Sequence, residues 1–239
     1  MIRHSVQNSR LQYSYSFTRC FAHRFTTNNK PISLPVPPPP PTTQHHDLDS
    51  FLAYAKRTDL SPETTTYVGT HYEYTVRNTL QRYSLNLTRI GGRSDRGIDL
   101  VGTWALPSSP RPLRLIVQCK ALKTKAGPNL VRELEGTFVG APVGWRGEGI
   151  LGMLMTTREA TKGVRDTLAN SRFPLIWALA GLDGTLQQFL WNRRAAEAGL
   201  EGLGVEVRYA GGPPTVRPIV LTWNGVELPD ALSEDTVKS

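Results

Sequence analysis

Three polar side chains interrupt the most β-like part of the chain. The apolar segment 113–120 ends in Gln118 and Lys120, and the preceding apolar run carries Asp99. Side chains alternate along a strand, so Gln118 and Lys120 should share one face, and a carboxylate at Asp99 would be costly to bury without a partner. Antiparallel pairing of the two strands would bring all three side chains into one small patch.

A carboxylate, an amide oxygen and an ammonium group together suit the hydrolysis of a phosphodiester bond. The oxygens of Asp99 and Gln118 are ligands that Mg²⁺ or Mn²⁺ accepts, and these ions keep several waters. Lys120 beside the ion could orient or deprotonate a water, while the metal stabilises charge on a phosphate oxygen. The alternative is an ordinary strand end at the surface, where polar side chains need no functional explanation.

The same residues resemble a known nuclease superfamily. Gly-Gly-Arg-Ser-Asp-Arg-Gly-Ile-Asp-Leu at 91–100, followed by Val-Gln-Cys-Lys at 117–120, is similar to the PD-(D/E)XK superfamily, in particular to its Mrr-like restriction endonuclease branch. This resemblance implies a restriction endonuclease-like fold in which Asp99 binds the metal, Gln118 lends its carbonyl and Lys120 handles the water.

Flanking helices extend the resemblance. The Mrr-like branch has an upstream helix with a Glu after an aromatic residue, which Tyr72 and Glu73 reproduce, and a helix after the lysine, which residues 131–136 mirror. By this resemblance Glu73 completes or supports the site. Gln118 stands where most of the superfamily has an acid, so the site has one negative charge less with which to hold a second cation.

Basic residues border the predicted site on both sides. Arg93 and Arg96 precede it in the chain, and Lys123 and Lys125 follow it. Cations at these positions could contact the phosphates of a nucleic acid, and each contact would steepen the salt dependence of binding. The alternative for scattered charges of this kind is ordinary solubility.

The formal net charge of +8 is concentrated at the N-terminus. The first acidic residue is Asp47, and the segment before it is rich in Arg, Ser and Thr. Such a segment, without a continuous apolar stretch, is typical of a mitochondrial or plastid transit peptide. Residues 1–30 are therefore interpreted as a mitochondrial transit peptide, with the matrix as destination. A basic disordered tail that touches nucleic acid or merely solvates the chain is the alternative.

The leader and a later motif together resemble a fungal mitochondrial family called required for respiratory growth protein 7, which carries this nuclease-like domain. The motif is Gln-Phe-Leu-Trp-Asn at 188–192. The resemblance implies a mitochondrial location and a link to respiratory competence, but no particular reaction. Maintenance of the mitochondrial genome, by action on mitochondrial DNA, would account for that link.

Length and composition provide for one folded domain with an extension. The chain has 239 residues, of which 39% are apolar. Its apolar runs fall far short of the ~18–20 residues that cross a bilayer, so no integral membrane segment is expected. Residues 31–46 are interpreted as a Pro-rich linker in which His45 and His46 are solvated, residues 47–228 as the domain and residues 229–239 as a flexible tail.

Hydrophobic periodicity and turn signals predict a mixed α/β pattern of elements, and the resemblance to restriction endonucleases implies that they form a mixed β-sheet core flanked by helices. The disordered leader and the Pro-rich linker precede this core. The predicted helices are 47–56, 61–83, 129–140, 159–169 and 194–200, and the predicted strands are 85–90, 98–106, 113–120, 150–156, 174–180, 185–191, 205–209 and 216–223.

The leading hypothesis is a mitochondrial nuclease that depends on Mg²⁺ or Mn²⁺ and acts on DNA rather than RNA. The resemblance implies that a homodimer is possible, because many members of the superfamily dimerise to cut both strands of a duplex. One alternative is a protein of the same fold that binds nucleic acid without cutting it. Another is a respiratory assembly factor that works through protein contacts.

Overall fold

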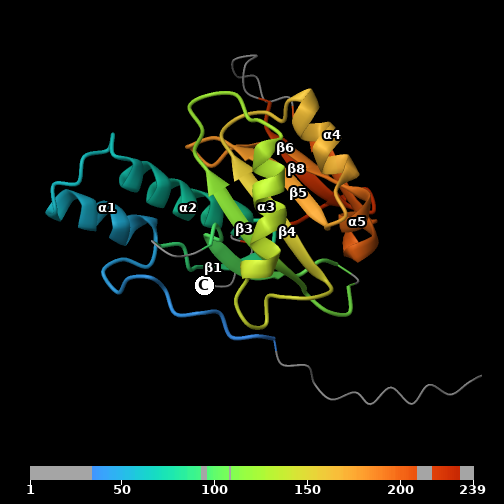
Figure 1. Cartoon of the computed structure of the whole chain (residues 1–239), viewed down its shortest axis with the longest axis horizontal. Coiled ribbons are helices and arrows are strands. Elements are labelled where there is room, and N and C mark those ends of the chain that lie inside the picture. Colours follow the sequence, from blue (N-terminus) through green and yellow to red (C-terminus); the bar gives the residue numbers. More distant parts are fainter. Residues whose placement is uncertain (1–33, 93–95, 108, 209–216, 232–239) are drawn as a thin grey trace, which may run out of the picture. The chain divides into compact units, whose positions relative to one another are not determined.

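The computed structural model describes residues 34–92, 96–107, 109–208 and 217–231 (Figure 1). The expected transit peptide, Arg93 and the tail from residue 232 lie outside these ranges. The helices are α1 Leu48–Arg57, α2 Thr65–Gln81, α3 Asn129–Gly140, α4 Lys162–Asn170 and α5 Arg193–Ala195, which continues into a π-helical turn at Ala196–Leu200. The strands are β1 Leu85–Arg89, β2 Leu100–Trp104, β3 Leu113–Lys120, β4 Ile150–Thr156, β5 Leu175–Ala180, β6 Leu186–Trp191, β7 Leu203–Val207, β8 Ile219–Trp223 and β9 Val226–Glu227.

Six strands form one mixed sheet in the order β1-β2-β3-β4-β5-β6. The pairs β1/β2, β2/β3 and β5/β6 are antiparallel, whereas β3/β4 and β4/β5 are parallel. Each parallel connection passes through a helix, α3 or α4, as a parallel crossover requires. A smaller sheet contains β7, β8 and β9. The α/β fold class with a mixed sheet flanked by helices is therefore confirmed.

Helices cover both faces of the six-stranded sheet (Figure 1). On one face Tyr72 and Val76 of α2 share an apolar cluster with Val117 of β3. On the other face Leu134 of α3 and Val164 of α4 belong to a second cluster. Every residue of β4 is buried, which explains why its sequence is a continuous apolar run rather than an alternating one.

Several element ends differ from the sequence prediction. Strand β2 begins at Leu100 rather than at 98. Just before Leu100, the Cys119 N–H bonds to the Asp99 side chain instead of to a backbone carbonyl of the neighbouring strand. Helix α4 begins at Lys162 rather than at 159, because the Thr161 side chain accepts a hydrogen bond from Val164 N–H and caps the helix. Strand β9 was not predicted, although Asn224 and Gly225 both have positive φ and such Asn-Gly pairs form tight hairpin turns.

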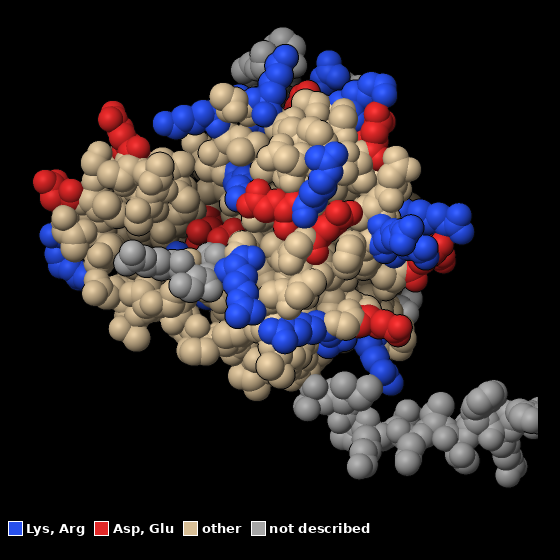
Figure 2. All heavy atoms as spheres, viewed as in Figure 1, with Lys and Arg blue, Asp and Glu red and all other residues tan. Residues whose placement is uncertain are grey.

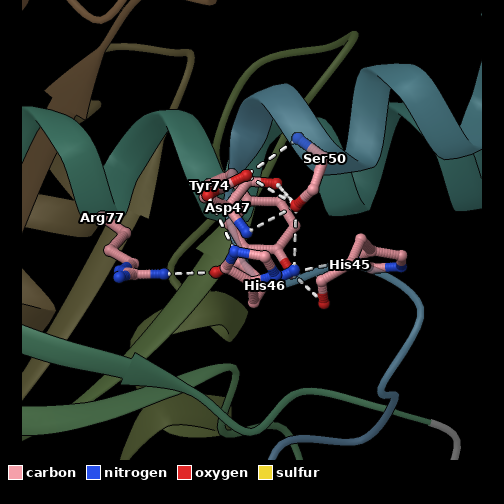
Figure 3. Close-up of polar contacts among 6 residues, drawn as sticks. All are labelled: His45, His46, Asp47, Ser50, Tyr74 and Arg77. Carbon is pink, nitrogen blue, oxygen red and sulfur yellow. Dashed lines mark hydrogen bonds and ion pairs between the residues drawn. The ribbon is translucent and has the colours of Figure 1, made fainter.

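The stretch just before α1 is anchored to the domain through His45 and His46 (Figure 3). His45 is only 8% exposed, its Nδ1 lies 2.8 Å from the Tyr74 hydroxyl, and that hydroxyl donates to the His45 carbonyl at 3.2 Å. Arg77 donates to the His46 carbonyl at 2.7 Å. The expectation that His45 is solvated is wrong, because aromatic rings from α1 and α2 surround its ring.

Two further contacts bring the Pro-rich stretch close to loops of the domain. A side chain at Gly144 would meet Pro35, and a side chain at Gly92 would meet Pro41. No helix or strand forms between 34 and 47, as proline chemistry predicts, because proline lacks the amide donor of regular structure. None of the helices in the described part of the chain has the length and hydropathy needed to cross a bilayer.

We predict that His45 makes stability fall in mild acid. Burial, followed by the charges of Arg89 and His46, lowers the pKa of His45 from 6.5. Below about pH 6.5 the unfolded chain gains a proton that the folded chain resists, so the free energy of unfolding falls as the pH drops, by at most about 1.4 kcal/mol per pH unit. Urea unfolding from pH 7.5 to 5.0 measures this slope.

His45→Gln, whose side-chain amide can still donate a hydrogen bond to the Tyr74 hydroxyl, should flatten that pH dependence. His46→Gln is the comparison variant, because its side chain is 82% exposed and its charge is the smallest of the three causes that lower the pKa of His45, so it should flatten the slope much less than His45→Gln does. An equal slope in His45→Gln and the parent protein would contradict the prediction.

A second prediction tests the close packing of β1 on β2. A Cβ atom at Gly102 would lie 2.0 Å from the Asn86 carbonyl oxygen, whereas a Cβ atom at Gly136 on α3 would meet nothing within 4 Å. Gly102→Ala should therefore destabilise the fold by about 3 kcal/mol or more, whereas Gly136→Ala should stabilise it by about 0.5–1 kcal/mol. Denaturant midpoints of the two variants measure this contrast, and a similar midpoint in both would refute it.

Candidate active site at the ends of β2 and β3

Gln118 and Lys120 converge on a single carboxylate from α3. Gln118 Nε2 donates to Glu133 Oε1 at 3.1 Å, and Lys120 Nζ donates to the same oxygen at 2.6 Å. Both side chains therefore lie on the α3 face of the sheet, as the alternation along β3 predicts. The sequence reasoning missed Glu133. The sequence feature that could have identified Glu133 is an acidic residue in the first turns of the helix that follows a strand ending in lysine.

Asp99 lies across from these two residues at the start of β2. Leu100 pairs with Val117 in the antiparallel register, and Asp99 N–H donates to the Val117 carbonyl at 2.9 Å. The Asp99 carboxylate then accepts the N–H of Cys119 at 2.7 Å. Cys119 is the residue between Gln118 and Lys120, so the tertiary structure brings Asp99 next to both of them.

The orientation of the Gln118 amide leaves its oxygen available. Gln118 is 1% exposed, and the bond to Glu133 assigns its Nε2 as the donor. Its Oε1 is buried and has no hydrogen-bond partner among the described residues. A buried acceptor without a partner is costly. A donor or a cation that is not part of the described chain would relieve that cost.

The donor set therefore fits a Mg²⁺ or Mn²⁺ ion, although with few protein ligands. Asp99 would supply a carboxylate oxygen and Gln118 the unpaired amide oxygen, and these ions complete their shells with water. Within the described residues, no group of three or more His, Cys, Asp and Glu side chains that could hold a metal is formed. A metal here would rest on one carboxylate and one amide.

Two glycines make room for the candidate ligands. A Cβ atom at Gly91 would lie 3.0 Å from Asp99 Oδ1, and one at Gly97 would lie 3.0 Å from Gln118 Nε2. Gly97 also has a φ of 80°, which side chains disfavour. The glycines of the predicted motif therefore allow the loop that carries them to approach Asp99 and Gln118 closely.

Glu73 lies on the other face of the sheet from Gln118 and Lys120. It belongs to α2, which packs on the face that contains Val117, and it forms an ion pair with Arg89 of β1. The two side chains are only 13% and 11% exposed, and Arg89 also lies over the Tyr74 ring. Its position suits support of β1 beside Asp99 rather than direct contact with Lys120.

Cys119 faces the α2 side of the sheet, where it packs against the apolar cluster that contains Tyr72 and Val76. Burial, followed by the negative charges of Asp99 and Glu73, raises the pKa of the Cys119 thiol well above its usual value. The thiol is therefore neutral at physiological pH and unsuited to act as a nucleophile.

The basic residues of the prediction lie at both ends of α3. Lys123 and Lys125 are exposed in the loop that leads into the helix, whereas Arg96 packs against Gly140 at its end. A helix of 12 residues is about 18 Å long. Figure 2 shows acidic side chains in the middle of this face and basic side chains above and below them.

Comparison with known proteins identifies the family. The family model described as required for respiratory growth protein 7 matches residues 64–111 and 106–209, which include all the described site residues. The chain belongs to this family. The resemblance stated from the leader and the 188–192 motif is thereby confirmed.

Two relatives show how far the likeness extends. An uncharacterized mitochondrial protein of Schizosaccharomyces pombe is 34% identical over 155 residues, which cover 63% of this chain and 61% of that protein. The mitochondrial required for respiratory growth protein 7 of Zygosaccharomyces rouxii is 26% identical over 170 residues, covering 54% of this chain and 70% of that protein. The chain thus spans about three fifths of the S. pombe protein. Both relatives are named mitochondrial, so the expected mitochondrial location is confirmed.

Among solved structures, the MspJI restriction endonuclease in complex with a 27-mer oligonucleotide is similar to part of the chain. The identity is 12%, the TM-score is 0.35, and the match covers 57% of this chain and 29% of that one. At this score the likeness carries no conclusion about the chemistry of the family member described here.

A third prediction concerns Glu73. Removing one partner of a buried ion pair leaves an uncompensated charge, so Glu73→Gln should lower the free energy of unfolding by about 3–5 kcal/mol. The double variant Glu73→Gln, Arg89→Met should recover part of this loss, because no charge is then left unpaired. Chemical denaturation of the single and double variants measures the effect. If the double variant is less stable than the Glu73→Gln protein, the pair is not the source of the loss.

Proposed function

We propose that this family member is a Mg²⁺-dependent nuclease that hydrolyses phosphodiester bonds in mitochondrial DNA. The observation that carries the proposal is the convergence of Gln118 and Lys120 on Glu133, with the Asp99 carboxylate bonded to the residue between them. The unpartnered Gln118 Oε1 supports it, because a buried amide oxygen beside a carboxylate is suited to a hard divalent cation.

Each residue has a distinct part in this proposal. Asp99 and Gln118 would hold the metal, which when bound stabilises negative charge on the phosphate. Lys120 is 31% exposed at its side chain, so its ammonium group can reach a water or a phosphate oxygen at the surface. Glu133 holds the Gln118 amide with its oxygen directed away and keeps Lys120 close to it.

The charge distribution around the site suits a nucleic-acid backbone. Lys123 and Lys125 lie at one end of α3 and Arg96 at the other. Phosphates that follow the backbone past Lys120 would meet cations in both directions. Action on mitochondrial DNA would also account for a family that is named for respiratory growth.

A second candidate is a protein of the same fold that binds nucleic acid without cutting it. The observation that favours it is the Lys120 to Glu133 ion pair, because an ammonium group held by a carboxylate is less available to a water or a phosphate. Both candidates require the basic residues, and they differ only in turnover.

A fourth prediction separates these candidates. The purified full-length chain should cleave linear and circular DNA with Mg²⁺ and stop when EDTA is added. Asp99→Asn keeps an acceptor for the Cys119 N–H but removes the charge, and Lys120→Met keeps the aliphatic stem. Each should lower the cleavage rate by about 100-fold or more, because each removes charge stabilisation at the reacting phosphate, while the thermal midpoint stays near that of the parent protein.

Lys162→Met is the matched control for this assay. Lys162 is 84% exposed on α4 and paired with Asp166, so its loss should leave cleavage unchanged. A folded parent protein that binds DNA but does not cut it with Mg²⁺ or Mn²⁺ would support the second candidate. Equal cleavage by the parent protein, Asp99→Asn and Lys120→Met would reject this site.

A further inference from the structure

A polar cavity lies beside the loop that carries Lys123 and Lys125. It has a volume of about 450 Å³, and its lining includes Lys125, Thr157, Arg158 and Gln187 over an apolar floor at Leu179. Binding sites for small molecules commonly have volumes of this order. None of its lining residues belongs to the Asp99, Gln118 and Lys120 site.

The wall of this cavity is pre-formed rather than loose. Thr157 Oγ1 donates to the Leu122 carbonyl at 3.0 Å, and Arg158 donates to the carbonyls of Leu122 and Lys123 at 3.2 and 3.0 Å. These bonds fix the basic loop against the end of β4. Lys125 is thereby presented at the cavity, so binding there would cost little ordering of the chain.

The charge in the cavity favours an anion. Lys125 and Arg158 form no ion pair with a carboxylate among the described residues, and Glu159 is the one acid in the lining. The lining therefore has an excess of one positive charge. Arg158 donates hydrogen bonds from its Nε and one terminal nitrogen to carbonyls of the loop. The other terminal nitrogen of its guanidinium group can therefore donate to a ligand.

The cavity begins next to the candidate active site. Lys120 and Thr156 are partners in the parallel β3/β4 ladder, and Thr157 follows Thr156 directly. From the spacing of strands and the rise per residue, the Cα atoms of Lys120 and Thr157 are about 6 Å apart. Figure 1 shows both strands ending at the same edge, under the loop that leads into α3. This separation is short enough for consecutive nucleotides of one strand.

We propose that this cavity binds one nucleotide of the substrate strand, the neighbour of the nucleotide at Lys120. Its phosphate lies against Lys125 and Arg158, and its nucleoside lies over Leu179 with Gln187 at its polar edge. This proposal rests on the proposed nucleic-acid substrate. It adds that the strand enters the site with one nucleotide unstacked, so single-stranded or frayed ends are bound more tightly than continuous duplex.

The test measures binding of adenosine monophosphate to the full chain by calorimetry, in the presence of EDTA. We expect saturable binding at one site, and inorganic phosphate should bind at least about ten-fold more weakly because it lacks the nucleoside. Lys125→Gln should weaken the binding of adenosine monophosphate by about ten-fold, since one charge-assisted hydrogen bond is lost. The matched control Lys162→Gln makes the same charge change on α4 and should bind as the parent protein does.

Three results would overturn the proposal. In the first, the folded parent protein shows no saturable binding of adenosine monophosphate. In the second, inorganic phosphate binds as tightly as adenosine monophosphate. In the third, Lys125→Gln and Lys162→Gln bind adenosine monophosphate equally. The assay needs neither metal nor cleavage. A protein that binds adenosine monophosphate as expected but cuts no DNA would therefore refute the nuclease function and keep the cavity assignment, whereas a nuclease without this binding would do the reverse.

Discussion

The candidate site depends on the hydrogen bonds that the Glu133 carboxylate accepts. One oxygen accepts from both Gln118 and Lys120, so the position of α3 on the sheet sets the position of both side chains. The same contact decides the orientation of the Gln118 amide, because only its nitrogen can donate to a carboxylate. Without α3 in this place, the polar end of β3 would be an ordinary strand end. A helix and a strand that are sequential in the chain thus define the site together.

The sheet separates two kinds of polar interaction at this point. On the α3 face the polar groups are partly accessible, as Lys120 and Glu133 show. On the α2 face the pair of Glu73 and Arg89 is almost completely buried. Buried charges tolerate little change because loss of one partner is costly, whereas accessible charges can exchange partners with a ligand. This division is the physical reason for assigning support to Glu73 and chemistry to Lys120.

Membership of the family and the geometry of the site answer different questions. The family match covers most of the described sheet and brings with it a mitochondrial location, but its name describes a growth requirement and no reaction. The reaction proposed above rests on Asp99, Gln118, Lys120 and Glu133. The adjoining cavity extends the same argument, because its lining includes Thr157 and Arg158, which directly follow Thr156, the partner of Lys120 in the β3/β4 ladder.

The sequence by itself determined the elements and the candidate residues. The bounds of β3, α3 and β4 agree with the prediction, because hydrophobic periodicity and turn residues are local signals. Only the tertiary structure decided the partners. Glu133 meets Lys120, Arg89 pairs with Glu73, and His45 bonds to Tyr74, which lies 29 residues further along the chain. Such contacts depend on how helices pack across the sheet, and a pattern of neighbouring residues does not contain that information.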